Sequence, residues 1–308
     1  MAPLPATPAR PHLEPTSASL DWADLAVIDL SRYDLDRDGL ARQVEKAMTT
    51  NGFFYVTNHG YPRDRTQRMF DVAGVPFKDV DAEEKVKYHA EMVAKGSYQG
   101  YKPRNYWTID KDVKDQIEHY NINRDVTKRQ HPSAVRPFLP EIAAFAKFNQ
   151  EILEKILTLF SIALGLPPSS LSDIHKYEEE GESYVRFMIY YPRTQDEEAK
   201  TNQTWLKGHT DFGSVALLWS QPIASLQMLD FDDKWRYVKP VDGSLIVNAG
   251  DMLEMLSGGK FKATIHRVVQ PPQDQQGVER LGYCGMKLIL TTVYFTLPCR
   301  MTASTYGL

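Results

Sequence analysis

Cysteine is scarce in this chain of 308 residues: only Cys284 and Cys299 occur, and neither belongs to a CxxC pair. This scarcity excludes a disulfide framework and a four-cysteine zinc site, and it favours a reducing compartment. An excess of basic residues is also lacking, because 36 Lys and Arg stand against 40 Asp and Glu, for a net charge of −4. Without a basic stripe to neutralise phosphates, nucleic-acid binding is not expected.

Long apolar runs are absent as well. The most hydrophobic stretch, residues 152–166, is shorter than the roughly 20 residues that span a bilayer, and it contains Glu154 and Lys155. Residues 1–20 are rich in proline and contain no apolar signal core, so we expect a disordered lead-in rather than a secretory signal. We therefore predict a cytoplasmic protein that does not bind membranes. Neither a GxGxxG motif nor a P-loop is present to indicate a nucleotide site.

The two parts of the chain that follow differ in their patterns. Residues 21–180 are mainly helical in pattern, and the clearest helix is expected at 140–164, where apolar side chains recur every three or four residues. Residues 181–308 read as short strands separated by turns. The expected strands cover residues 27–30, 52–56, 184–191, 208–219, 225–231, 234–241, 244–248, 262–270 and 288–297. Many short strands with few helices between them predict a mainly β fold with flanking helices: a helical N-terminal half packed on a double-sheet β core, as one compact unit.

Three side chains have the chemistry of a metal site. On a strand, His209 and Asp211 would project to one face, because residues two apart share a side. His266 lies in another apolar stretch. Two histidines and one carboxylate form the facial triad of non-haem Fe(II) oxygenases, which leaves coordination positions open for a co-substrate and dioxygen. The same ligand types hold catalytic zinc, so a zinc hydrolase remains an alternative, although no HExxH helix is present.

A longer series of motifs follows one order along the chain. The motifs are Val27-Ile-Asp-Leu, Gly52-Phe-Phe-Tyr-Val-Thr-Asn-His-Gly60, Tyr190-Tyr191-Pro192, His209-Thr-Asp211, Leu226-Gln227, Trp235, Pro240 and the runs 242–251 and 253–268. From about residue 27 to 297, the sequence resembles the isopenicillin-N-synthase-like branch of the 2-oxoglutarate- and Fe(II)-dependent dioxygenases. The resemblance implies a double-stranded β-helix (jelly roll) and iron held by His209, Asp211 and His266.

The resemblance also implies a reaction. Oxygen and 2-oxoglutarate would be consumed, with release of succinate and carbon dioxide, while a small organic molecule is hydroxylated, desaturated or cyclised. We expect a monomeric enzyme of specialised metabolism. Two rivals stay open: an oxidase of the same fold that needs no 2-oxoglutarate, and an inactive binding protein.

The co-substrate anchor is where the sequence departs from the family. The resemblance implies an arginine in an Arg-x-Ser pattern after the second histidine, and Arg280 is the candidate, but Leu281-Gly282 follows it. Residues 282–292 look like an insertion, so either Arg280 keeps its place or Lys287 replaces it. Tyr191 matches the family's tyrosine for the same carboxylate.

Substrate contacts are sought among aromatic residues near the expected barrel mouth. The candidates are Phe187, Phe212, Tyr101, Tyr294, Tyr106 and Trp107. Four other histidines, His89, His119, His131 and His175, lie among polar residues, so we expect them to be solvated.

Overall fold

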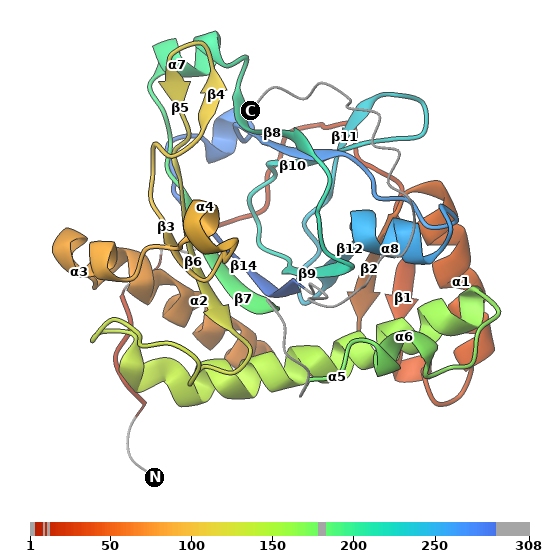
Figure 1. Cartoon of the computed structure of the whole chain (residues 1–308). Coiled ribbons are helices and arrows are strands. Elements are labelled where there is room, and N and C mark those ends of the chain that lie inside the picture. The colour runs from red at the N-terminus through yellow and green to blue at the C-terminus, as the bar shows by residue number, and fades with distance from the viewer. Residues whose placement is uncertain (1–3, 9, 11–12, 178–182, 288–308) are drawn as a thin grey trace.

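The computed structural model describes residues 4–8, 10, 13–177 and 183–287, and the protein is mostly sheet with helices around it (Figure 1). An eight-stranded sheet has the order β1-β2-β12-β9-β14-β7-β6-β3, and a four-stranded sheet has the order β11-β10-β13-β8. Between the described strands of these two sheets, every pairing is antiparallel except that of β1 with β2. The larger sheet comprises β1 (Val27–Asp29), β2 (Phe53–Thr57), β3 (Gly100–Lys102), β6 (Ile117–Asn123), β7 (Tyr184–Tyr190), β9 (Val215–Trp219), β12 (Leu245–Ala249) and β14 (Arg280–Lys287). The smaller comprises β8 (Thr204–His209), β10 (Leu226–Leu229), β11 (Trp235–Tyr237) and β13 (His266–Val269), while β4 (Thr108–Asp110) and β5 (Val113–Lys114) form a separate hairpin.

Helices cover the outer face of the larger sheet. In Figure 1 the long helix α5 runs beneath the strands, with α2 on one side and α1 on the other. The expected helix at 140–164 is confirmed as α5, whose apolar stripe is buried against the sheet and α1. The helices are α1 (Arg37–Thr50), α2 (Arg63–Lys78), α3 (Ala82–Lys87), α4 (Met92–Lys95), α5 (Leu139–Ala163), α6 (Ser170–Asp173), α7 (Gln195–Lys200) and α8 (Asp251–Leu256).

Two cores result from this layering, and strand alternation decides which side chain enters which core. One apolar cluster lies between the helices and the larger sheet, and the other lies between the two sheets. On β7, Phe187 and Ile189 enter the helix-side core, whereas Met188 and Tyr190 face the smaller sheet. This alternation determines which residues of β7 can reach a site inside the sheets.

Three expectations about strands need correction. The expected strand at 208–219 is two strands, β8 and β9, and Asp211 lies in the loop between them. Strand β6 is not among the expected strands, because Glu118, His119, Asn121 and Asn123 interrupt its apolar pattern. The segment interpreted as an insertion is in its first part a strand, β14, which pairs with both β7 and β9 and has a register shift after Cys284. The expected strand at 288–297 lies outside the described residues.

The expectation that the histidines are solvated is wrong for three of them. His119, His131 and His175 are 3%, 5% and 2% exposed, whereas His89 is exposed. Burial is tolerated where ring nitrogens find partners: His131, for example, bonds Tyr120 Oη at 2.7 Å and Val126 O at 2.8 Å.

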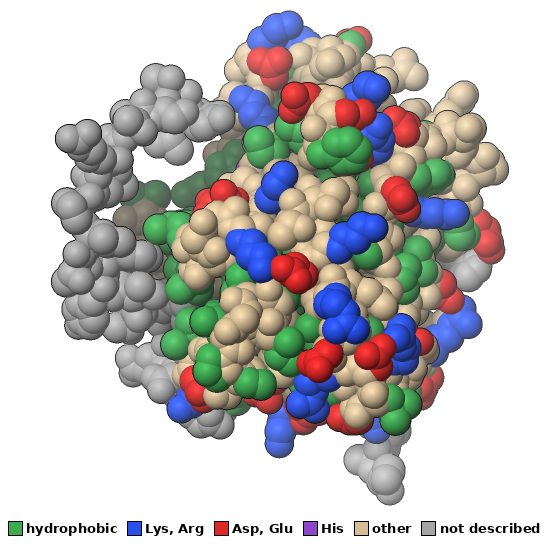
Figure 2. Space-filling view, turned by 90° about the vertical axis from the view of Figure 1, so that its right-hand side faces the viewer, with side chains coloured by type: hydrophobic (Ala, Val, Ile, Leu, Met, Phe, Trp, Pro, Cys, Tyr) green, Lys and Arg blue, Asp and Glu red, His purple; other side chains and the backbone are tan. Residues whose placement is uncertain are grey.

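Charged side chains of both signs lie on the surface (Figure 2), and part of the N-terminal segment contacts the body of the protein. On the face shown in Figure 2, basic and acidic side chains are intermixed. The pair Lys260–Glu45, with Nζ and Oε1 2.6 Å apart, joins the segment after α8 to α1. Part of the expected lead-in contacts the body of the protein, since Thr16 Oγ1 donates to Asp274 Oδ1 at 2.7 Å. Among the described residues, no helix combines the length and the apolar character that a bilayer crossing requires.

Candidate metal and co-substrate site

The three predicted metal-ligand side chains meet at one end of the smaller sheet. His209 ends β8 and His266 begins β13, and the two are paired directly across the strands. Asp211 follows two residues after His209. One ligand atom from each residue lies within 4.8 Å of the other two. The imidazole centroids are 4.4 Å apart, and His266 Nε2 lies 4.0 Å from Asp211 Oδ1.

Backbone carbonyls fix which nitrogen of each imidazole faces the site. His209 Nδ1 lies 2.9 Å from Lys207 O, and His266 Nδ1 lies 3.2 Å from Thr264 O. A carbonyl oxygen can only accept, so each Nδ1 must carry the hydrogen, and the lone pair is left on Nε2. Both rings thus keep Nε2 for a metal ion and have at Nδ1 the outer hydrogen bond that metal-binding histidines need.

Asp211 is oriented by a residue that sequence reasoning did not single out. Asn248, on β12, donates from Nδ2 to Asp211 Oδ2 at 3.0 Å, while Oδ1 is the oxygen nearest His266. Asn248 lies within the run 242–251 that carries the family resemblance, but nothing in the sequence distinguishes it from its neighbours. Only the pairing of β12 with β9 shows that it reaches the loop after β8.

The loop that carries Asp211 is clamped by backbone contacts. Gly250 N donates to Ser214 O at 3.0 Å, and Asp251 N donates to Asp211 O at 2.8 Å. A Cβ on Gly250 would lie 2.1 Å from Gly213 O and 2.4 Å from Asp211 O. Glycine is therefore required here for space rather than for φ, which is −112°.

A cavity between the two sheets continues from these side chains to a buried arginine. Arg280 is 4% exposed, its Nε has no hydrogen-bond partner, and no acidic side chain in the described part of the chain forms an ion pair with it. Its guanidinium carbon lies 5.2 Å from the centroid of the Tyr190 ring. An unneutralised buried guanidinium is costly unless an anion occupies the cavity. The lining residues are Phe53, His119, Arg186, Met188, Tyr190, Leu206, His209, Asp211, Ala216, Leu218, Leu226, Ile246, Asn248, His266, Val268, Arg280 and Cys284; we call this the inner cavity.

Burial tunes the groups beside the metal ligands. Desolvation lowers the pKa of Arg280, which nonetheless stays protonated because an arginine begins so far above neutral pH. Desolvation also raises the pKa of Tyr190, so its phenol stays protonated and can donate a hydrogen bond. A fixed cation beside a phenol donor suits a carboxylate.

The structure places Arg280 in the cavity and assigns the neighbouring tyrosine differently from the sequence. Arg280 begins β14 opposite Tyr190, while Lys287 pairs with Tyr184 at the far end of the same strand. Tyr191 is not among the cavity's lining residues: its hydroxyl donates to Glu118 at 3.2 Å, and Arg104 stacks on its ring. Tyr190 occupies the inward position because inward and outward side chains alternate along β7.

Most of the aromatic substrate candidates lie elsewhere. Phe187 is in the helix-side core for the alternation reason given above. Tyr101 is in the same core, with its hydroxyl 2.8 Å from Pro76 O. Phe212 is 66% exposed and does not line the cavity. Tyr106 and Trp107 are likewise not among its lining residues, and Tyr294 lies outside the described residues.

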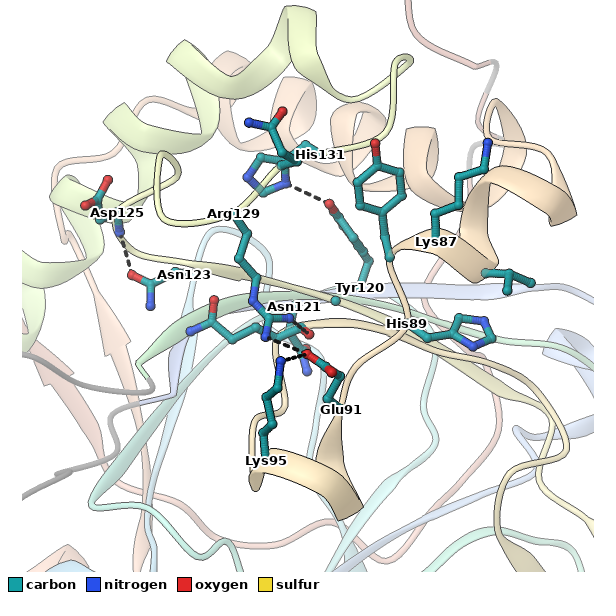
Figure 3. Close-up of a pocket in the computed structure, with 15 residues that line it drawn as sticks. Lys87, His89, Glu91, Lys95, Tyr120, Asn121, Asn123, Asp125, Arg129 and His131 are labelled. Carbon is teal, nitrogen blue, oxygen red and sulfur yellow. Dashed lines mark hydrogen bonds and ion pairs between the residues drawn. The ribbon is translucent and has the colours of Figure 1, made fainter.

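A larger cavity, of about 630 Å³, lies outside the sheets and lacks this chemistry; we call it the outer cavity. Figure 3 shows Glu91 pointing toward Lys95 and Arg129, and Tyr120 pointing toward His131. Lys95 Nζ is 2.9 Å from Glu91 Oε2, and Arg129 is 3.8 Å from the same oxygen. Here both cations have a carboxylate as partner, in contrast to the arginine of the inner cavity.

Two parts of the chain match models of known protein families. Residues 25–141 match the model described as the non-haem dioxygenase N-terminal family, named for morphine synthesis, and residues 183–284 match that of the 2OG-Fe(II) oxygenase superfamily. The second match spans both histidines, Asp211 and Arg280. The chain belongs to the 2OG-Fe(II) oxygenase superfamily.

Individual members show how far the similarity extends. The chain is 27% identical to homoarginine-6-hydroxylase 2-ODD-C23 of Glycine max, over 81% of this chain and 82% of that protein. It is 29% identical to a leucoanthocyanidin dioxygenase of Perilla frutescens, over 81% and 69%. The structure of Neurospora crassa T7H with alpha-KG superposes with a TM-score of 0.76 at 20% identity, covering 87% of this chain and 85% of that one.

Membership confirms the expected chemistry. The chain is an oxidoreductase that uses Fe(II), 2-oxoglutarate and O2 on a small molecule. The oxidase that needs no 2-oxoglutarate, the inactive binding protein and the zinc hydrolase are not favoured.

Proposed function

We propose that His209, Asp211 and His266 hold the Fe(II) ion and that Arg280 anchors the distal carboxylate of 2-oxoglutarate. One observation carries the proposal: a preformed set of two imidazoles and one carboxylate opens into the same cavity as a buried guanidinium with no acidic partner among the described residues. The donor set fits Fe(II), because neutral imidazole with a single carboxylate leaves the metal positive and able to take a chelating anion.

The chain's own residues position the co-substrate. Arg280 would pair with the distal carboxylate as a planar fork, and the protonated phenol of Tyr190 would donate to the same group. When bound, the iron supplies the site at which O2 is reduced while 2-oxoglutarate is decarboxylated to succinate. The apolar side chains Phe53, Leu218 and Ile246 line the inner cavity and exclude water from this region.

The two packed sheets are best interpreted as the double-stranded β-helix implied by the resemblance. The relatives named for homoarginine and leucoanthocyanidin act on small organic molecules. We therefore infer a role in specialised metabolism, with hydroxylation, desaturation or ring closure as the outcome.

The metal assignment is tested by anaerobic titration of the full chain with Fe(II) and 2-oxoglutarate. Chelation of iron by the keto acid gives a visible charge-transfer band. We expect the band in the wild type and its loss in His266→Ala, because two remaining ligands hold the ion poorly. His89→Ala is the matched control, since this histidine is exposed. Retention of the band in His266→Ala would remove His266 from the site.

The same titration tests the anchor. Removing one partner of a buried charge pair costs about 2–5 kcal/mol, so Arg280→Leu should raise the Kd for 2-oxoglutarate at least about 30-fold. Lys287→Leu should leave this Kd within about twofold of the wild type. If only the Lys287 variant weakens binding, the assignment of Arg280 is wrong.

A further inference from the structure

A second arginine lines the inner cavity and has no part in the proposed co-substrate site. Arg186 lies on β7, two positions before Met188 on the same inward face. Arg186 is paired with Cys284, in the middle of β14, whereas Arg280 is paired with Tyr190, the last residue of β7. The two guanidiniums therefore serve different parts of the cavity.

Arg186 is held in place by two neutral groups. Its Nε donates to Asn121 Oδ1 at 2.9 Å, and a terminal nitrogen donates to Tyr184 Oη at 2.8 Å. Its guanidinium carbon lies 5.0 Å from the centroid of the Tyr184 ring. No ion pair to Arg186 is formed by any acidic side chain that the structure describes. The position and orientation of the guanidinium are thus fixed, while no described residue supplies a counter-ion for its charge.

A purely structural brace between β6 and β7 would not need this charge. Asn121 lines the outer cavity, where lysine and arginine face Glu91, and an amide there could brace a neutral side chain equally well. Placing a cation against neutral partners beside apolar walls costs free energy that a bound anion would recover. The arrangement resembles that of Arg280, except that Arg186 is partly accessible.

The balance of charge limits what the anion can be. Among the residues that the structure describes, two arginines but only one acidic side chain line the inner cavity; the acid is Asp211, which the proposed function gives to the divalent metal. Because 2-oxoglutarate is a dianion, it leaves one positive charge uncompensated once it is bound. A monoanion fits the remainder, whereas a phosphate, with up to two charges, exceeds it. The apolar lining, such as Met188 and Leu218, fits a hydrocarbon skeleton.

We propose that Arg186 binds the carboxylate of the substrate, so that the oxidised molecule is a small organic acid with an apolar skeleton. This inference rests on the proposed function, because it takes the Arg280 side of the cavity to be occupied by 2-oxoglutarate. Asn121 and Tyr184 act as positioning residues that aim the guanidinium.

The test is calorimetric binding to the full chain, loaded anaerobically with Fe(II) and 2-oxoglutarate. The probes are benzoate, phenylacetate, 3-phenylpropionate and cinnamate, each paired with its primary amide, which keeps the skeleton and removes the charge. We expect at least one acid to bind the wild type about tenfold or more tightly than its amide, since charge-assisted hydrogen bonds are the stronger ones. Arg186→Gln should bring that ratio close to one.

Arg104→Gln is the matched control. Arg104 is also held by a neutral amide, Gln116, and stacked on a tyrosine, Tyr191, but it does not line the inner cavity. The Arg104→Gln variant should therefore keep the wild type's preference for the acid over its amide. Arg186→Lys, which retains the charge, should keep part of that preference and serves if the glutamine variant fails to fold.

Three results would overturn the inference. One is equal binding of every acid and its amide by the wild type, and another is an acid preference that survives in Arg186→Gln. The third is a rise in the Kd for 2-oxoglutarate in Arg186→Gln as large as that in Arg280→Leu, which would assign Arg186 to the co-substrate. If the wild type binds 2-oxoglutarate as expected but shows no preference for any acid over its amide, the proposed function stands and only the substrate class is rejected.

Discussion

At the scale of single residues, the position of Asp211 depends on neighbours that are not themselves candidate metal ligands. Asp211 is placed by the Asn248 amide on one side and by the backbone of residues 250–251 on the other. Neither contact involves a residue whose type alone suggests metal binding. The candidate ligands can be recognised from their residue types, but the position of Asp211 is fixed by Asn248 and Gly250.

This makes Gly250 a test of positioning. In Gly250→Ala the new methyl group would meet backbone oxygens of Gly213 and Asp211, which cannot rotate away, so the Asp211 loop must shift. We expect the affinity for Co(II), followed by its visible absorption, to fall about 10- to 100-fold, as when other outer contacts of metal ligands are lost.

Gly74→Ala provides the control. A methyl group there would meet only Leu281 Cδ2, at 3.9 Å, and alanine is favoured in the helix. The idea that Gly250 is needed for space fails if Gly250→Ala binds Co(II) as tightly as Gly74→Ala.

At the scale of elements, loops between strands are fixed by side chains from the helical layer. His175 follows α6, donates from Nδ1 to Leu171 O at 2.6 Å, and accepts at Nε2 from Ser214 Oγ at 2.9 Å. Ser214 belongs to the loop between β8 and β9 that carries Asp211. Burial lowers the pKa of His175 to about 4, so the ring is neutral at pH 7 and both bonds are kept.

The lowered pKa predicts a pH dependence of stability. The unfolded chain binds a proton at His175 near pH 6.5 and the folded chain only near pH 4, so the free energy of unfolding falls as pH falls between these values. The contribution is on the order of 3 kcal/mol, at about 1.4 kcal/mol per pH unit. Urea unfolding at several pH values gives the free energy of unfolding as a function of pH. Between pH 4 and 6.5 this free energy should change less steeply with pH in His175→Gln than in the wild type. Identical slopes would contradict the assignment.

At the scale of the whole molecule, the larger sheet is assembled from both parts of the chain. Strand β12 pairs with β2, and β7 pairs with β6, so strands from before residue 180 lie on both sides of the C-terminal strands. Helix α5 closes the core, where Trp219 Nε1 donates to Asn149 Oδ1 at 3.0 Å.

The shared sheet predicts that the C-terminal part does not fold alone. A fragment of residues 183–308 would expose the helix-side core and leave β7 and β12 with unpaired edges. We expect weak near-UV circular dichroism and no cooperative urea transition, with both restored by co-expression of residues 1–182. Cooperative unfolding of the isolated fragment would show that the β core is an independent domain.

Much of this architecture can be predicted from the sequence because its signals are local. The stripe of α5 and the apolar strands β7, β10 and β12 depend on the spacing of neighbouring residues. Strand β6 is hard to predict, since polar residues interrupt its apolar pattern: His119 lines the inner cavity and Asn121 lines the outer one. The break between β8 and β9 falls at residues 210–214, where Asp211, Gly213 and Ser214 are turn-forming residues, and the prediction of one strand at 208–219 gave them too little weight against the apolar residues that follow.

The sequence by itself determined the family and so the class of chemistry, because the order of its motifs can be read without coordinates; for iron and the keto acid it predicts His209, Asp211, His266 and Arg280. Only the tertiary structure decided the geometry: that Tyr190 rather than Tyr191 faces Arg280, that Asn248 holds Asp211, and that Arg186 enters the same cavity with no ion-pair partner among the described residues. The physical reason is that side chains alternate along a strand, so a register set by pairing with distant strands decides which residues reach the inner cavity.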